Sequence, residues 1–258
     1  MKKSILLPVL ASALFVTANA QTTIFSENFS SGGTGWTLNV NTGTNATTPN
    51  SWEVNDSEGG VTPPGCGVAS NGNNTLHITC TSAFCGSLIT GAVYNAGKTS
   101  NKRVESPAIN STGHTNLTLK FNFISNGDGL LDNASVLYND GTGWQVLTAS
   151  IKSPVCGSGQ GQWTAYSANL PASCNNIANL KIAINWTNNA DNVGTDPSIA
   201  LDDVALTGTP SASPLSATAN TTNLLCNNVC SGSATVTPSG GNPPYTYNWA
   251  PSGGSNAT

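Results

Sequence analysis

The chain has 258 residues, of which only 8% are charged, with 8 Lys and Arg against 12 Asp and Glu and a formal net charge of −4. Basic residues do not cluster, which argues against nucleic acid and anionic membrane surfaces as partners. A composition rich in Gly, Ser, Thr and Asn is compatible with disorder, but six tryptophans indicate a packed core. We therefore expect a folded protein whose surface is solvated mainly by amides and hydroxyls.

Residues 1–20 have the pattern of a secretory signal peptide. Lys2 and Lys3 precede an apolar run at residues 5–16, and Ala18-Asn19-Ala20 offers small side chains for cleavage. The run is too short to span a bilayer, and no later stretch is long and apolar enough to do so. We predict a secreted protein with no transmembrane segment, whose mature chain begins at Gln21. Without the two signal lysines it has 6 basic and 12 acidic residues, a net charge of −6.

Seven cysteines in an exported chain predict disulfides rather than metal or redox chemistry. The expected pairs close short loops or a hairpin: Cys80 with Cys85, Cys226 with Cys230, and Cys156 with Cys174, with Cys66 left over. Other pairings remain open, because spacing alone does not determine connectivity.

After residue 20 the pattern is that of β-strands. Short apolar or alternating runs are separated by Gly, Asn and Asp clusters that favour turns. The runs cover residues 22–25, 75–79, 117–123, 134–138, 144–147, 180–186 and 199–206. In the clearest run, residues 117–123, Leu and Phe alternate with Thr118, Lys120 and Asn122. This pattern predicts an all-β chain with an antiparallel jelly-roll β-sandwich.

Composition divides the mature chain into two modules. Residues 21–208 suit one sandwich, and residues 209–214 contain two prolines and small polar residues typical of a linker. Residues 215–258 start a second β-pattern, but too few strands follow to bury an adequate core. We therefore expect the second module to be partial.

The first module resembles the jelly-roll domains of the MAM and cleaved-adhesin families of secreted proteins. The matching residues are the run at 25–29, Gly35-Trp36, Trp52, residues 106–109, Trp144, Trp163 and residues 199–204. The resemblance covers nearly the whole module.

The second module resembles an SprB-type repeat, a unit of large surface adhesins of gliding bacteria. Residues 226–236 and 240–249 carry the match, including the motif Gly-Gly-Asn-Pro-Pro-Tyr at 240–245. The resemblance implies a partial Ig-like or PKD-like β-sandwich and an origin in Bacteroidetes-type bacteria.

Three acids form the candidate metal site: Glu27, Asp202 and Asp203. The first and last strands of a jelly roll often lie side by side, which would crowd these carboxylates. A hard cation such as Ca²⁺, which prefers several oxygen ligands, would relieve their repulsion. In the domains that the first module resembles, these positions help to hold a structural cation. The alternative is that the acids are exposed or accept hydrogen bonds from turns.

The tryptophans allow two interpretations, sugar-stacking platforms or core residues. Trp36, Trp52 and Trp163 occupy recurrent positions of the resembled module, where packing is the expected role. Trp186 lies ambiguously among polar neighbours, and Trp249 is expected to pack against Tyr245 or Tyr247.

Catalysis finds little support, since the chain has two histidines and no nucleophile motif. We predict a non-enzymatic surface adhesion or interaction protein, with a β-sandwich recognition domain on a stalk of repeats. Its partner would be an extracellular glycan or protein surface. One alternative is a glycan-binding accessory region of a larger secreted hydrolase or peptidase, and another is a structural spacer.

Overall fold

The computed structural model describes residues 20–58, 73–80, 91–156, 160–211, 213–222, 233–241 and 244–247. The predicted signal peptide (save its last residue), the expected Cys226–Cys230 pair and Trp249 lie outside these residues. The described chain is nearly all β, which confirms the expected fold class. Its strands are β1 Thr22–Glu27, β2 Thr37–Asn41, β3 Ser51–Asn55, β4 Thr75–Thr79, β5 Ser100–Glu105, β6 His114–Ser125, β7 Asn133–Asn139, β8 Trp144–Thr148, β9 Thr164–Asn169, β10 Lys181–Asn188, β11 Ile199–Pro210, β12 Ser216–Thr222 and β13 Ser233–Ser239.

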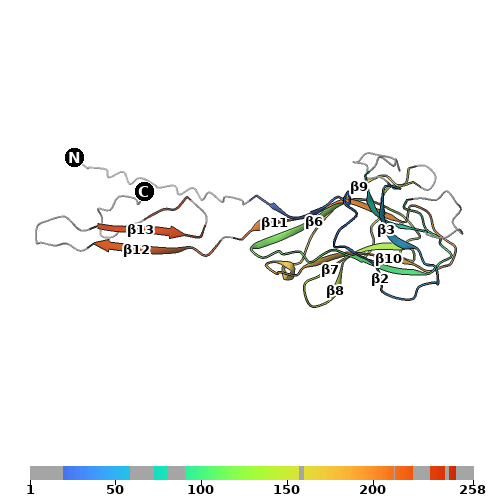
Figure 1. Ribbon diagram of the computed structural model, residues 1–258, viewed down its shortest axis with the longest axis horizontal. Coiled ribbons are helices and arrows are strands. Elements are labelled where there is room, and N and C mark those ends of the chain that lie inside the picture. Colours follow the sequence, from blue (N-terminus) through green and yellow to red (C-terminus); the bar gives the residue numbers. More distant parts are fainter. Residues whose placement is uncertain are drawn as a thin grey trace, which may run out of the picture.

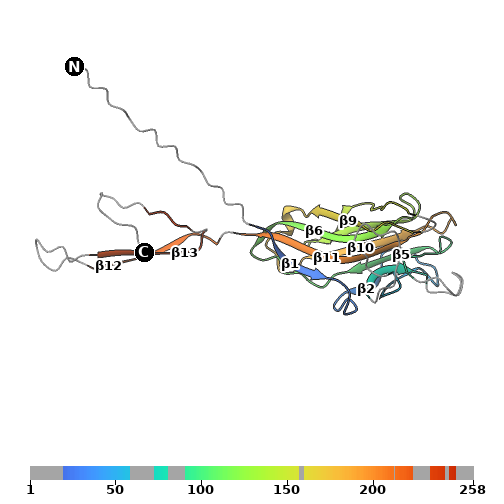
Figure 2. The same ribbon diagram turned by 90° about the horizontal axis from the view of Figure 1, so that it is seen from above.

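Two antiparallel sheets form the sandwich (Figures 1 and 2). The first sheet has the order β3-β4-β11-β6-β9, with β1 also paired to β11. The second sheet has the order β2-β5-β10-β7-β8. Strands distant in sequence are therefore neighbours, and the first and last strands of the sandwich lie side by side, as predicted.

The core forms between the two sheets because each contributes one apolar face. In β6, Leu117, Leu119, Phe121 and Phe123 are buried while Lys120 is exposed, which confirms the alternation expected for this run. From the second sheet, Val104, Val136, Ile182 and Ile184 join the same cluster.

Four tryptophans are core residues. Trp36, Trp52 and Trp163 are buried, as predicted, and Trp186 is fully buried. The Trp186 ring meets Tyr94 edge-on, with the ring centroids 5.0 Å apart. Burial therefore settles the ambiguity at Trp186 and removes it from the possible sugar platforms.

One expected disulfide is wrong. Cys174 is a free, buried thiol at the end of the short 3₁₀ helix η2 (Ala172–Cys174), and it packs in the core cluster. Cys156 is disulfide-bonded, so its partner is not Cys174. Cys80 is also disulfide-bonded, while Cys66 and Cys85 lie outside the described residues.

The described part of the second module is a two-stranded hairpin, β12–β13, beyond the end of β11 (Figure 1). β11 itself continues to Pro210, where Thr209 pairs with Thr115 and Pro210 with His114. The first sheet thus includes two residues of the expected linker. Among the described residues, no helix is long and apolar enough to cross a membrane.

Candidate functional site

The acids predicted to bind a metal gather where β1 meets β11. Glu27 ends β1 and is in register with Val204, the residue that follows Asp203. Asp202 is buried at 2% exposure, whereas Asp203 is exposed and has a left-handed φ of 53°. The pairing of β11 with β6 shifts register between Asp202 and Ala205, so the strand is locally irregular at the two aspartates.

Each of these carboxylates already accepts a hydrogen bond. Glu27 Oε1 accepts from the Phe29 amide at 2.7 Å, and Asp203 Oδ2 accepts from Asn122 Nδ2 at 3.1 Å. Asp202 accepts from Asn73 Nδ2 at 3.0 Å and from the Asp203 amide at 2.8 Å. Burial raises the pKa of Asp202 to about 6, and the charges of Asp203 and Glu27 add to the shift.

The fit to a cation is therefore partial. The oxygen ligands are of the type that Ca²⁺ prefers, and a cation would stabilise the charge of the buried Asp202. Within the part of the chain that the structure describes, however, no three His, Cys, Asp or Glu side chains are grouped closely enough to hold one metal ion. Calcium binding stays a prediction.

A second polar site lies on the outer face of the second sheet. Along β5, Arg103 and Glu105 alternate with the buried Val104. Along β10, Lys181 precedes the buried Ile182. Because successive side chains of a strand point to opposite faces, the charged residues point away from the core.

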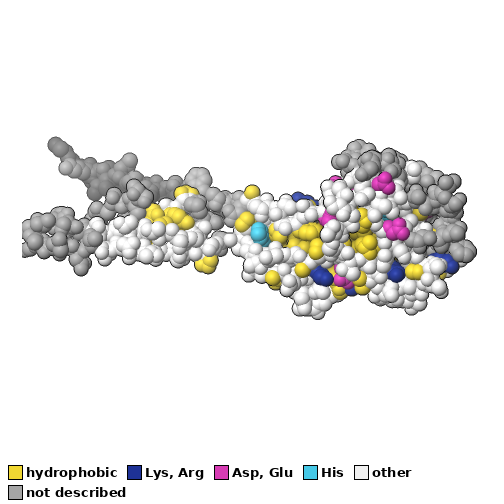
Figure 3. All heavy atoms as spheres, viewed as in Figure 1, with side chains coloured by type: hydrophobic (Ala, Val, Ile, Leu, Met, Phe, Trp, Pro, Cys, Tyr) yellow, Lys and Arg dark blue, Asp and Glu magenta, His cyan; other side chains and the backbone are white. Residues whose placement is uncertain are grey.

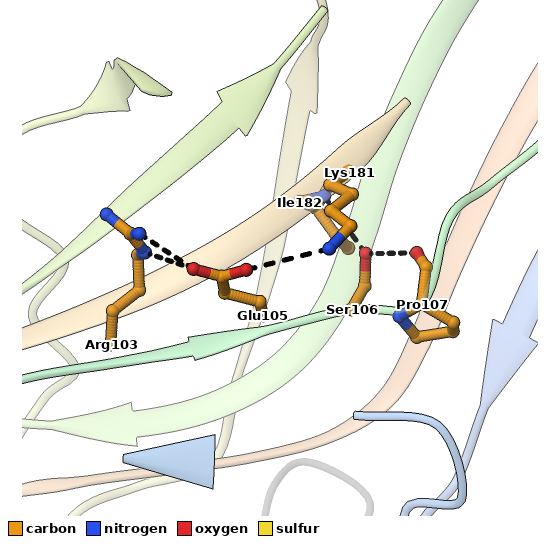
Figure 4. Close-up of polar contacts among 6 residues, drawn as sticks. All are labelled: Arg103, Glu105, Ser106, Pro107, Lys181 and Ile182. Carbon is orange, nitrogen blue, oxygen red and sulfur yellow. Dashed lines mark hydrogen bonds and ion pairs between the residues drawn. The ribbon is translucent and has the colours of Figure 1, made fainter. Parts of the chain in front are cut away.

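These charged residues form a small network (Figure 4). Arg103 donates from Nε and Nη2 to Glu105 Oε1, at 3.0 and 2.7 Å. Lys181 Nζ lies 3.7 Å from Glu105 Oε2. Beside the network, Ser106 Oγ accepts a hydrogen bond from the Ile182 amide at 3.0 Å and donates one to the Pro107 carbonyl at 2.8 Å. The end of β5 is thereby held against β10.

Trp144, at the start of β8, completes this face. It is half-buried, and the Arg103 guanidinium carbon lies 4.4 Å from the centroid of its ring. Ala183 faces the same side between β5 and β7 and is only 1% exposed, so the larger side chains of this face close over it. Nearby Val146 is 59% exposed. We call Arg103, Glu105, Lys181 and Trp144 the outer-face site.

The outer-face site was missed from the sequence, apart from Trp144 as a residue of the resemblance. Arg103 and Trp144 are 41 positions apart, and no motif joins them. The available signal was the spacing of Arg103 and Glu105 on either side of Val104, in a chain with only 8% charged residues.

The two histidines lie apart from this site. His77 is fully buried in β4, where burial lowers its pKa to about 4. Its Nδ1 lies 3.1 Å from the Thr75 hydroxyl. His114 starts β6 and contacts the Thr112 carbonyl of the preceding turn.

Solved structures similar to this chain include small β domains. The K3 cleaved adhesin domain of Lys-gingipain from Porphyromonas gingivalis W83 is 18% identical, with a TM-score of 0.40 over 72% of this chain and 98% of that one. The CBM22-2 xylan-binding domain of Paenibacillus barcinonensis Xyn10C is 16% identical, with a TM-score of 0.34 over 72% and 99%. Caldicellulosiruptor saccharolyticus CBM27-1, solved with mannohexaose, is 11% identical, with a TM-score of 0.37 over 75% and 99%.

No curated protein matches the chain significantly. A family model does match the second module, over residues 218–254. That family is described as the SprB repeat, so the resemblance predicted for the second module is confirmed.

Proposed function

We propose that the sandwich binds a glycan through the outer-face site, and that the chain acts as a non-enzymatic adhesin at the cell surface. The observation that carries this proposal is a half-buried Trp144 stacked on Arg103. The indole face turned away from the guanidinium would offer a flat apolar surface to a sugar ring, while adjacent polar groups would bond the sugar hydroxyls.

Rigidity supports the assignment. Arg103 is held by two hydrogen bonds to Glu105, and Trp144 packs on the guanidinium, so little side-chain freedom remains to be lost on binding. Half-buried polar residues are in register with the pair, since Asn139 lies opposite Trp144 and Asn185 lies opposite Arg103, with Ser135 on the far side of Asn185. Their hydroxyls and amides are suited to sugar hydroxyls.

The rest of the proposal concerns export and architecture. The signal pattern of residues 1–20 supports secretion, and the SprB-type match supports a repeat that extends from the sandwich. We include a structural Ca²⁺ near Glu27, Asp202 and Asp203, on the first sheet and away from the glycan. A glycan-binding accessory region of a larger secreted enzyme would use the same outer-face site.

The test is saccharide binding by the purified mature chain, measured by titration calorimetry against a panel of neutral and acidic oligosaccharides. We expect Trp144→Ala to weaken binding by about fivefold or more, since one aromatic stack contributes on the order of 1 kcal/mol or more. Trp144→Phe should keep part of the affinity. Leu215→Ala, which removes an exposed side chain of the second module, is the control. The proposal is wrong if no saccharide binds, or if Trp144→Ala binds as tightly as the natural chain.

A further inference from the structure

The two sheets of the sandwich carry opposite charge. The strands of the second sheet have three basic residues and one acid, a net charge of +2: Lys102, Arg103, Lys181 and Glu105. The strands of the first sheet have one basic residue and four acids, a net charge of −3: Lys120, Glu27, Glu53, Asp202 and Asp203. In the view of Figure 3, most of the visible basic groups lie along the lower side of the sandwich, with acidic atoms among them, where Figure 1 places β2, β8 and β10. Half of the mature chain's bases thus lie on this sheet. Lys102 alternates with Arg103 and points to the other face, so the strand bases of the outer face are Arg103 and Lys181.

Within the outer-face site, two bases share one acid. Both hydrogen bonds that the Arg103 side chain donates to described residues go to Glu105 Oε1, whereas Lys181 Nζ lies 3.7 Å from Glu105 Oε2. The Lys181 side chain is 37% exposed, against 15% for Arg103 and 13% for Glu105. Lys181 therefore has donor capacity facing solvent, and the site keeps a net charge of +1.

Asp140, in the turn next to Trp144, keeps its negative charge near neutral pH but forms no ion pair with these bases among the described residues. Among the described residues, the ion pairs of Arg103 and Lys181 are both with Glu105. Asp140, in the turn that leads to β8, accepts hydrogen bonds from the Thr142 amide and hydroxyl instead. A neutral sugar has no need of two bases on the face that receives it.

From this arrangement we infer that the outer-face site selects acidic glycans, whose carboxylate or sulfate meets Lys181 and the edge of Arg103 while a sugar ring lies on Trp144. This inference rests on the proposed function and names its ligand class. Charge-assisted hydrogen bonds to such an anion are shorter and stronger than those to a hydroxyl. The anion would also draw Lys181 away from its long contact with Glu105.

The experiment compares saccharides that share a backbone and differ in charge. Oligogalacturonate is paired with its methyl ester, which tests carboxylate, and carrageenan oligosaccharides are paired with agarose oligosaccharides, which tests sulfate. In calorimetry with the full mature chain, we expect at least one acidic form to bind about tenfold tighter than its neutral partner. Its affinity should fall as NaCl rises, because salt screens exposed charges.

Variants assign the preference to the site. Lys181→Met should weaken binding of the acidic form by much more than binding of the neutral form, and so remove most of the preference. Glu105→Gln should increase the preference, since it frees both bases. Lys120→Met, which removes an exposed base from the first sheet, is the matched control and should have no effect. Thermal unfolding of each variant checks that it is folded.

The outcomes separate the two proposals. If acidic and neutral forms bind equally but Trp144→Ala abolishes both, the inference is overturned and the proposed function stands. If Lys120→Met lowers affinity as much as Lys181→Met, the attraction is diffuse and the inference is also overturned. If no saccharide of either kind binds, the proposed function itself fails.

Discussion

A buried carboxyl at Glu58 gives the sharpest stability prediction. Its side chain is 3% exposed, and its Oε2 accepts a hydrogen bond from the Ala92 amide at 2.7 Å. Burial raises the pKa of Glu58 from 4.5 to about 7, and the charge of Asp196 adds to this increase against the opposing effect of the Ala92 bond. Glu58→Gln keeps the shape and the acceptor oxygen but cannot become charged.

The direction of the pH dependence of stability follows from proton binding to Glu58. Since the folded-state pKa lies above the unfolded value, the folded state binds the proton more tightly. The stabilisation from protonated Glu58 is complete below pH 4.5 and is lost as the pH rises to about 7. At about 1.4 kcal/mol per pKa unit, a shift from 4.5 to about 7 amounts to about 3 kcal/mol.

The assay is urea unfolding followed by tryptophan fluorescence, from about pH 4 to pH 8, with disulfides intact. Near pH 4 the natural chain and Glu58→Gln should have similar free energies of unfolding. Near pH 8 the variant should be more stable by about 3 kcal/mol. Asp140→Asn, at an exposed turn, should show no such gain. A difference between natural chain and Glu58→Gln that does not change with pH would refute the reasoning.

Three further predictions test other parts of the structure. Saturating Ca²⁺ should raise the melting temperature of metal-free protein, because a hundredfold excess over Kd adds about 3 kcal/mol to the free energy of unfolding. Asp202→Asn should abolish this rise, and an unchanged melting curve of the natural chain would exclude the ion. Trp186→Ala should lower the free energy of unfolding by about 4 kcal/mol because it empties a core site, whereas Trp144→Ala should cost under about 1 kcal/mol; equal losses would contradict the burial of the two rings. A chain ending at Ser211 should melt cooperatively and at a higher temperature than one ending at Gly208, because the longer chain keeps the last pairs of β11 with the start of β6; circular dichroism decides between them.

Much of the fold was predictable because the buried face of a β-strand appears in the sequence as apolar residues at alternate positions. The alternation of Leu and Phe with polar residues in residues 117–123 identifies an inward and an outward face before any neighbour is known. The expected jelly roll places its first and last strands side by side, and the pairing of β1 with β11, with Glu27 opposite Val204, confirms that adjacency. The all-β class, the core roles of Trp36, Trp52 and Trp163, and the repeat were within reach of the sequence alone.

Tertiary structure determined the features that depend on contacts between strands distant in sequence. Cys174 is a free thiol packed in the core cluster, and Cys156 is bonded to a cysteine other than Cys174. The spacing of cysteines along the sequence does not determine this pairing. Arg103, Trp144 and Lys181 lie on three different strands, and no sequence motif around any of them marks a binding site. Only the order β5-β10-β7-β8, with Ala183 between the larger side chains, brings the indole onto the guanidinium. A local sequence pattern indicates which face of a strand is exposed to solvent. Sheet order and register determine which exposed side chains become neighbours on that face.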